Sequence, residues 1–283
     1  MNVRQHTPSF SKRSTQDQDL SFSHLRPNST WYCFRARTRP AAEQVAEGER
    51  LAVSDIDFVE HETGMNQSSR VLEIGCAWGR HSLELAHRGY TRVTSLDVCF
   101  NLVTYARERA TQAGYALDLL AMDYLDYRTD TPFDVVLSLY DRSCLGQPDE
   151  GQDRLSLEHL ARLLRPGGYL VFGIRDWPRD LPCPSRSWEE TDDGFELHEV
   201  LVDRRTMKCT HRIIHVCSDG NRKIYELTRI HYTFREVQAQ LDAAYFQLVN
   251  AYHAFDHSRS YGTENEGLVV VAQRKCDECV NEL

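Results

Sequence analysis

The chain has 283 residues, of which 41% are hydrophobic, so it can bury a sizeable core in one large domain or two small ones. Its 33 Lys and Arg against 42 Asp and Glu give a formal net charge of -9. This balance argues against nucleic acid or an anionic membrane as the main partner, because both attract a concentrated basic surface. No apolar run is long enough to span a membrane and no signal-peptide pattern opens the chain, so we expect a cytoplasmic protein.

Nine cysteines are scattered along the chain without the regular spacing of a disulfide framework, and most are expected to be small buried hydrophobes. Cys276 and Cys279 have the CxxC spacing of a metal ligand pair. Because no second pair of cysteines or histidines completes a zinc site, the sequence predicts no metal.

The N-terminal part of the chain divides into two segments. Residues 1–28 are rich in Ser, Gln, Thr and Asp, which predicts a disordered arm. Residues 29–69 are expected to form a helical lid segment, with a helix over about 41–61. The aromatic residues Trp31, Tyr32 and Phe34 either strap this segment to the core or cover a bound ligand.

From residue 70 onward, short apolar runs alternate with amphipathic stretches. We expect strands at about 70–74, 92–97, 116–121, 133–139 and 169–174, with helices at about 78–88, 99–114 and 157–164 between them. Strict alternation of this kind predicts a parallel sheet with helices on both faces.

The alternation breaks at residue 185. Residues 185–232 favour strands at about 195–202, 209–217 and 223–231, which predicts an antiparallel β cap inserted after the fifth strand. A helix at 234–244 and strands at 246–252 and 268–272 then return the chain to the main sheet. The predicted α/β domain therefore comprises residues 70–184 and 233–275, followed by a tail at 276–283.

A glycine turn follows the first strand, in the stretch Val71-Leu72-Glu73-Ile74-Gly75-Cys76-Ala77-Trp78-Gly79-Arg80. A dinucleotide-binding turn requires three glycines so that the backbone can approach a pyrophosphate. Ala77 and Arg80 replace two of them here. An acid at Glu73 would repel phosphate, whereas it suits a ligand that carries an ammonium or a sulfonium group.

Two further acids end the next two strands. Asp97 follows Glu73 at the spacing at which a carboxylate accepts hydrogen bonds from ribose hydroxyls. Asp123 is placed to accept a hydrogen bond from an adenine amine, with Met122 and Val98 on either side of the ring. The alternative role is a helix N-cap for Asp97 and a turn residue for Asp123. Three acids at one rim of a parallel sheet indicate a ligand site instead.

At these positions the sequence resembles the class I S-adenosylmethionine-dependent methyltransferases. The resemblance covers residues 70–174 and rests on the matching stretches 71–79, 79–86, 96–98, 122–123 and 164–170. The strand-rich insert is similar to that of a small-molecule subgroup, in which an antiparallel sheet covers the active site. The resemblance implies a Rossmann-like, doubly wound seven-stranded sheet with its last strand antiparallel, and an antiparallel β insert after strand five.

The resemblance also implies the cofactor S-adenosyl-L-methionine, with S-adenosyl-L-homocysteine as the product. In this family the first acid and the turn face the methionine moiety, the second acid faces the ribose and the third faces the adenine. The middle glycine of the family's turn is Ala77 here, which is expected to narrow the turn. The residues expected to bind the cofactor are Glu73, Gly75, Cys76, Ala77, Gly79, His81, Asp97, Val98, Met122, Asp123, Tyr124 and Leu139.

The reaction expected of such a cofactor is in-line displacement, in which the protein mainly holds the acceptor in place and excludes water. Tyr140, after the fourth strand, is the candidate to orient the acceptor, and His231 is the candidate base. Each is also compatible with a purely structural role. The expected substrate pocket comprises Tyr140, Arg175, Trp188, Tyr225 and Tyr232.

The sequence therefore predicts methyl transfer to an oxygen or nitrogen of a small-molecule acceptor, in a protein that can form a homodimer. One alternative is a protein or RNA methyltransferase, which would need Arg204, Arg205, Lys208, Arg212 and Arg222 in one exposed patch. A second is a non-catalytic S-adenosylmethionine-binding protein, suggested by Ala77. A third, a nicotinamide-dependent oxidoreductase, fits the turn least well.

Overall fold

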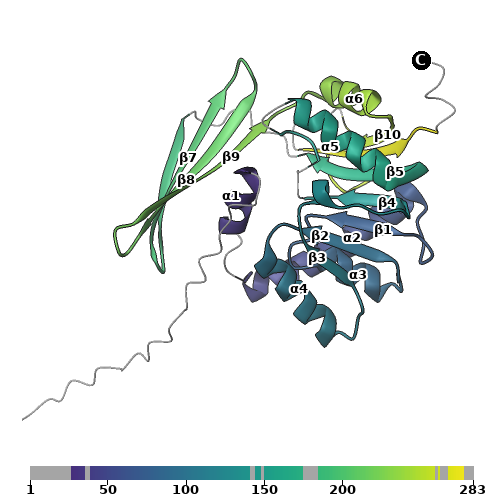
Figure 1. The fold of residues 1–283 in the computed structure, drawn as a ribbon, viewed down its shortest axis with the longest axis horizontal. Helices are drawn as coiled ribbons and strands as arrows, with labels where there is room; N and C mark the ends of the chain where they lie inside the picture. The colour runs from purple at the N-terminus through teal and green to yellow at the C-terminus, as the bar shows by residue number, and fades with distance from the viewer. Residues whose placement is uncertain are drawn as a thin grey trace, which may run out of the picture.

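The computed structural model describes residues 27–35, 39–140, 144–147, 150–174, 184–258, 261 and 267–276, which form a large and a small β-sheet with six α-helices (Figure 1). Among these residues, no helix is both long and apolar enough to cross a membrane. Most of the expected N-terminal arm and C-terminal tail, together with Arg175 and Cys279, lies outside the described ranges.

The large sheet has seven strands in the order β10-β11-β5-β4-β1-β2-β3. β1 to β5 run parallel, and β11 runs antiparallel to both of its neighbours, β5 and β10, which confirms the predicted topology. β5 begins at Leu164 rather than at the predicted Tyr169. The strands are β1 (Val71–Ile74), β2 (Val93–Asp97), β3 (Asp118–Ala121), β4 (Phe133–Ser138), β5 (Leu164–Ile174), β10 (Phe246–Tyr252) and β11 (Leu268–Arg274).

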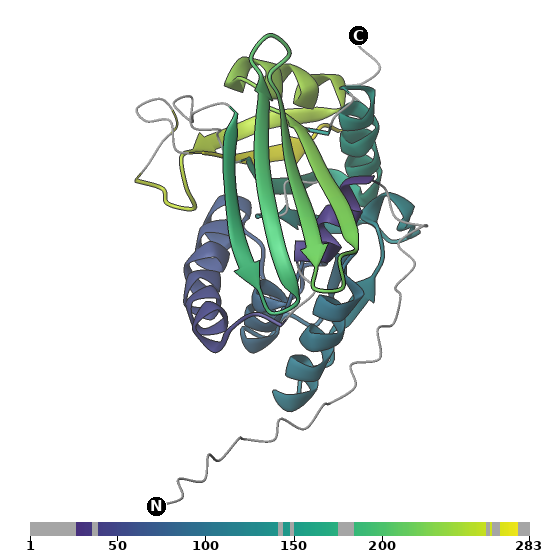
Figure 2. The same ribbon diagram turned by 90° about the vertical axis from the view of Figure 1, so that its left-hand side faces the viewer.

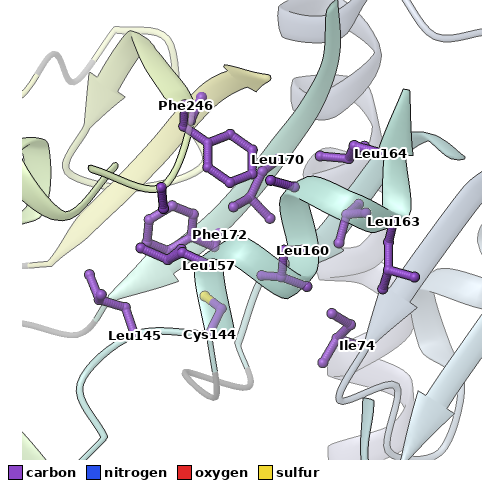
Figure 3. Close-up of a cluster of buried hydrophobic side chains, with 14 of the residues drawn as sticks. Ile74, Cys144, Leu145, Leu157, Leu160, Leu163, Leu164, Leu170, Phe172 and Phe246 are labelled. Carbon is purple, nitrogen blue, oxygen red and sulfur yellow. The ribbon is translucent and has the colours of Figure 1, made fainter. Parts of the chain in front are cut away.

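Helices cover both faces of this sheet, because its central strands are apolar on both sides. Side chains of α2 (Ala42–Thr63) and α3 (Arg80–His87) pack in one core, with α4 (Phe100–Gln112) beside them against β3. The other core lies beneath α5 (Glu150–Leu163) and α6 (Phe234–Ala243). There Leu157 and Leu160 of α5 meet Leu170 and Phe172 of β5, as Figure 3 shows.

The small sheet is antiparallel and has four strands in the order β6-β7-β8-β9. It stands over one side of the large sheet, with helix α1 beside it (Figure 2). Its strands are β6 (Ser185–Thr191), β7 (Gly194–Asp203), β8 (Lys208–Cys217) and β9 (Arg222–Ile230). The last three were predicted. β6 was missed because it is an exposed edge strand with a single large apolar residue, Trp188.

The aromatic cluster near the N-terminus lies in helix α1 (Pro27–Arg35). The first two residues of this helix lie within the arm that was predicted to end at residue 28. Proline suits the first turn of a helix, where its missing N–H costs nothing. One face of α1 packs on the small sheet: Phe34 stacks on Tyr225 of β9 with ring centroids 3.9 Å apart. The Sγ atom of Cys33 lies 3.6 Å from the carbonyl oxygen of Val98, so α1 also contacts the rim of the large sheet.

Candidate functional site

A cavity of about 1000 Å³ lies at the carboxyl ends of the parallel strands. Its floor is made by the segments that follow β1, β2, β3 and β4, and its other walls come from α1, α5 and β9. β1 lies between β2 and β4, so the cavity opens where the strand order reverses, the usual ligand site of such sheets. The small sheet and α1 therefore cover the predicted rim.

The turn after β1 is held by backbone hydrogen bonds and by three left-handed residues. The N–H groups of Gly75 and Cys76 donate to the carbonyl oxygen of Leu96, at 2.8 and 3.1 Å. Gly75 and Gly79 have φ values of 70° and 79°, and Ala77 keeps the same left-handed region at 48°. The alanine thus retains a glycine-like conformation, at some cost in strain.

Gly79 is the last residue of this turn and the N-cap of helix α3. A Cβ atom built at Gly79 would lie 3.0 Å from the Cβ atom of Ala106 in α4, closer than side chains normally approach. The absence of a side chain therefore allows α3 and α4 to pack closely beside the cavity.

The carboxylate of Asp97 connects the segments that follow β1 and β2. It accepts hydrogen bonds from the N–H of Ala77 at 2.9 Å and from the N–H of Cys99 at 2.7 Å. Burial raises the pKa of Asp97, and the two backbone donors oppose this shift. The carbonyl oxygen of Asp97 also accepts from Met122 at 2.9 Å, so the three rim segments lie side by side.

Asp123, at the third strand end, begins a short 3-10 helix at Tyr124–Asp126, where its carboxylate accepts from the N–H of Leu125 at 3.0 Å. Asp123 also lines the cavity. Asp123 therefore has the turn role considered from sequence and is also part of the cavity wall.

A series of polar contacts through buried His81 and Asp55 connects Glu73 to Tyr140, which also lines the cavity. Glu73 is 2% exposed, and its carboxylate contacts Nδ1 of His81 at 2.9 Å and accepts from the hydroxyl of Ser82. Nε2 of His81 lies 3.1 Å from Asp55 of α2, and the other oxygen of Asp55 accepts from the hydroxyl of Tyr140 at 3.1 Å.

The charged groups in this series of contacts shift the pKa values of His81 and Tyr140. Burial disfavours the imidazolium of His81, but hydrogen bonds to Asp55 and Glu73 outweigh it and raise the pKa of His81. Burial and the nearby charge of Asp55 raise the pKa of Tyr140. Tyr140 therefore keeps its proton at neutral pH and is suited to hydrogen bonding rather than to acting as a phenolate base.

The sequence analysis missed Asp55 and the roof residue Arg229, whereas it considered Tyr32 as part of a cover over a ligand. The sequence could have indicated Asp55, because this acid lies among the buried positions Ala52, Ile56 and Val59 of an amphipathic helix. The guanidinium of Arg229 in β9 donates to the hydroxyl of Tyr32 in α1 at 2.5 Å, and this pair connects residues 197 positions apart in the sequence.

The structure places the predicted site residues in two groups. Every residue expected to bind the cofactor lines the cavity except Gly79, and Tyr140 lines it too. The remaining described candidates lie outside the lining. Trp188 is 64% exposed, Tyr225 stacks on Phe34, and Tyr232 donates to Asp153 at 2.7 Å. His231 follows β9, where its N–H donates to the carbonyl of Met207 at 2.9 Å.

Among the residues that the structure describes, two clusters contain side chains of the types that bind metals, and both lie outside the cavity lining. In the cluster of His61, Glu62 and His257, the carboxylate of Glu62 accepts from Asn250 and Tyr252. In the cluster of Glu189, Glu196 and His198, Arg35 lies 3.4 Å from Glu196. Protein groups already pair with the central carboxylate of each cluster.

Comparison with known proteins agrees with this geometry. Residues 71–168 match the family described as "Methyltransferase domain". Tuberculostearic acid methyltransferase UfaA1 of Mycobacterium tuberculosis is 30% identical over 156 residues, which cover 53% of this chain and 35% of that protein. Phosphoethanolamine N-methyltransferase 1 of Arabidopsis thaliana is 27% identical over 156 residues, covering 54% of this chain and 30% of that protein.

A third relative, a ubiquinone biosynthesis O-methyltransferase of Idiomarina loihiensis, is 29% identical over 155 residues, covering 52% of this chain and 61% of that protein. The chain thus spans less than two thirds of the length of each of these three relatives.

Solved structures share the fold at low identity. A S-adenosylmethionine-dependent methyltransferase from Clostridium acetobutylicum has a TM-score of 0.65 at 14% identity, over 79% of this chain and 92% of that one. The CcbJ methyltransferase from Streptomyces caelestis has a TM-score of 0.64 at 16% identity, over 88% of this chain and 98% of that one.

Proposed function

We propose that this chain, which belongs to the class I S-adenosylmethionine-dependent methyltransferases, transfers a methyl group from that cofactor to an oxygen or nitrogen of a small-molecule acceptor. The observation that carries the proposal is that the glycine turn and the acids Glu73, Asp97 and Asp123 line one covered cavity of about 1000 Å³. This volume is at the upper end of typical small-molecule sites.

The residues of the rim fit the cofactor by their chemistry. Glu73 offers negative charge to an ammonium group, while Asp97 and Asp123 offer acceptors to ribose hydroxyls and to an adenine amine. Asp97 receives two backbone hydrogen bonds, so it is held in place, and its oxygens keep further lone pairs for the ligand. When bound, the cofactor supplies a methyl group that its sulfonium has already activated.

The chain's own residues then hold and orient the acceptor. Tyr140 donates its proton to Asp55, so its oxygen is oriented to accept a hydrogen bond from the acceptor's O–H or N–H. That contact would direct a lone pair of the acceptor atom toward the methyl group, and α1 would limit the access of water. The Tyr140–Asp55 pair, or solvent, would take up the proton that the acceptor atom loses on methylation.

The small sheet supports a small acceptor over a macromolecular one. Arg204, Arg205 and Lys208 lie at the turn between β7 and β8, whereas Arg222 lies at the opposite end of the sheet. Arg212, between them, is paired with Glu199 and Glu226 at 3.0 and 2.6 Å. These five residues therefore do not form the continuous basic patch that a nucleic acid needs.

The test uses the full chain, cofactor labelled in its methyl group, and a panel of small hydroxyl and amine compounds. Transfer of label to a small molecule supports the proposal. Label that appears only on added protein or RNA would favour the macromolecular alternative. A folded chain that binds S-adenosyl-L-homocysteine but transfers no label to any compound, protein or RNA would favour a non-catalytic binding protein.

A further inference from the structure

The charged side chains that line the cavity are divided by sign. Its three acids, Glu73, Asp97 and Asp123, all lie at strand ends where the cofactor is proposed. The other charged lining residues, two histidines aside, are six arginines: Arg35, Arg39, Arg80, Arg128, Arg162 and Arg229. Apart from these acids, the charged lining of the cavity is therefore basic, in a chain whose net charge is -9.

Arg229 is the most deeply placed of these arginines. It is 8% exposed, and its guanidinium lies 5.7 Å from the ring centroid of Tyr32 while it donates to the hydroxyl of that ring. The phenol and the sheet thus fix the guanidinium at the cavity roof. A buried cation is costly unless negative charge lies near it.

A carboxylate near Arg229, that of Asp153, lies behind the cavity wall. Its two oxygens accept from the N–H of Gln147 and the hydroxyl of Tyr232, at 2.8 and 2.7 Å. Burial raises the pKa of Asp153, and the charge of Arg229 is one of the influences that oppose this rise. Asp153 does not line the cavity, whereas Arg229 does.

Three other arginines of the lining contact groups elsewhere in the protein. Arg35 lies 3.4 Å from Glu196, and Arg39 lies 2.8 Å from Glu108. Arg80 lies 4.2 Å from the ring centroid of Tyr140 and shares Asp55 with His81. Arg128 and Arg162 are exposed, so Arg229 is the one buried arginine among the described residues of the lining.

We propose that the acceptor carries a carboxylate or phosphate group and that Arg229, positioned by Tyr32, binds this anion. The inference rests on the proposed function and narrows its substrate class. The planar guanidinium matches both groups, since it can donate two parallel hydrogen bonds to a pair of their oxygens. A single enclosed arginine fits one small anionic group, whereas a polyanion needs the continuous basic surface that the small sheet lacks.

The test measures binding of three probes to the full chain by ligand-observed NMR, with and without saturating S-adenosyl-L-homocysteine. The probes are benzoate, its neutral isostere benzamide, and inorganic phosphate. We expect benzoate or phosphate to bind at least about tenfold more tightly than benzamide, the range of one charge-assisted hydrogen bond.

Variants then test whether Arg229 causes the preference for an anionic probe. Arg229→Gln should remove the preference over benzamide, and Arg229→Lys should keep part of it because the charge remains. Arg222→Gln, an exposed arginine of the same strand outside the cavity lining, is the matched control and should leave the preference unchanged.

The outcomes separate this inference from the proposed function. Failure of the folded wild type to bind S-adenosyl-L-homocysteine counts against the function. Intact binding of that product with benzamide as tight as both anions, or with no anion bound, overturns the anion site alone. Displacement of the anions by a much tighter-binding short RNA overturns it in favour of nucleic acid. If Arg229→Gln does not fold, the wild-type comparison and Arg229→Lys still decide.

Discussion

Nδ1 of His81 lies 2.9 Å from a carboxylate oxygen of Glu73, and both side chains are buried. The other ring nitrogen faces Asp55 at 3.1 Å. Because a carboxylate accepts hydrogen bonds, both ring nitrogens must donate, so His81 is an imidazolium between two acids. Glu73, which we propose faces the cofactor's amine, is therefore held in place by the positive charge of His81, and that charge depends on pH.

This relationship predicts how stability changes with pH. The pKa of His81 is raised in the folded chain, so its stabilising effect is fully present below the unfolded pKa of about 6.5 and is lost as pH rises through the folded pKa. Urea denaturation of the cofactor-free chain should show this loss above about pH 6.5.

Two histidine variants separate the contribution of His81 to stability from that of other histidines. His81→Gln should lower the free energy of unfolding by about 3 kcal/mol near neutral pH, because it breaks a buried ionic pair, and should flatten the pH dependence. His87→Gln, on an exposed turn of the same helix, should change neither. An equally steep pH dependence in His81→Gln would contradict the assignment.

The left-handed backbone of Ala77 predicts that its replacement by glycine does not destabilise the protein. Its left-handed backbone costs about 1 kcal/mol in an L-residue, so Ala77→Gly should leave the unfolding free energy unchanged or slightly higher. Ala86→Gly, within helix α3, should instead lower it by about 1 kcal/mol. Chemical denaturation compares the two, and equal losses would show that Ala77 is not strained.

The Cys33 and Cys99 sulfurs, 3.3 Å apart, report on the contact between α1 and the large sheet. The hydrogen bond between them and burial raise the pKa of Cys99, which suppresses the reactive thiolate. Iodoacetamide should therefore modify exposed Cys276 long before either of them, as peptide mapping would show. Modification of all three at similar rates would mean that α1 does not stay closed over the rim.

The main sheet and the cofactor rim could be predicted from sequence because both depend on local pattern. Apolar runs such as 71–74 and 133–138 mark buried parallel strands, and Gly75, Asp97 and Asp123 at the ends of three strands mark the rim. The spacing of Glu73, Asp97 and Asp123 then follows from the alternation of strands and helices, which brings their positions to one edge.

The roof could not be predicted in the same way. Helix α1 has no clear apolar period, and its aromatic residues are explained only by contacts with the small sheet, far away in the sequence. Tyr225 and Trp188 were expected in the acceptor pocket for their residue type, but the pairing of the strands directs them elsewhere. Arg229 lies in the lining for the same non-local reason.

The central claim is that the strand-end acids bind S-adenosylmethionine, and calorimetric titration of S-adenosyl-L-homocysteine tests it most directly. The wild type should bind, and Asp97→Asn should bind about tenfold or more weakly with an unchanged circular dichroism spectrum, since it loses charged hydrogen bonds to the ligand. Asp118→Asn, at the opposite end of neighbouring strand β3, should bind as the wild type does. A folded wild type that does not bind, or Asp97→Asn with unchanged affinity, would contradict the claim.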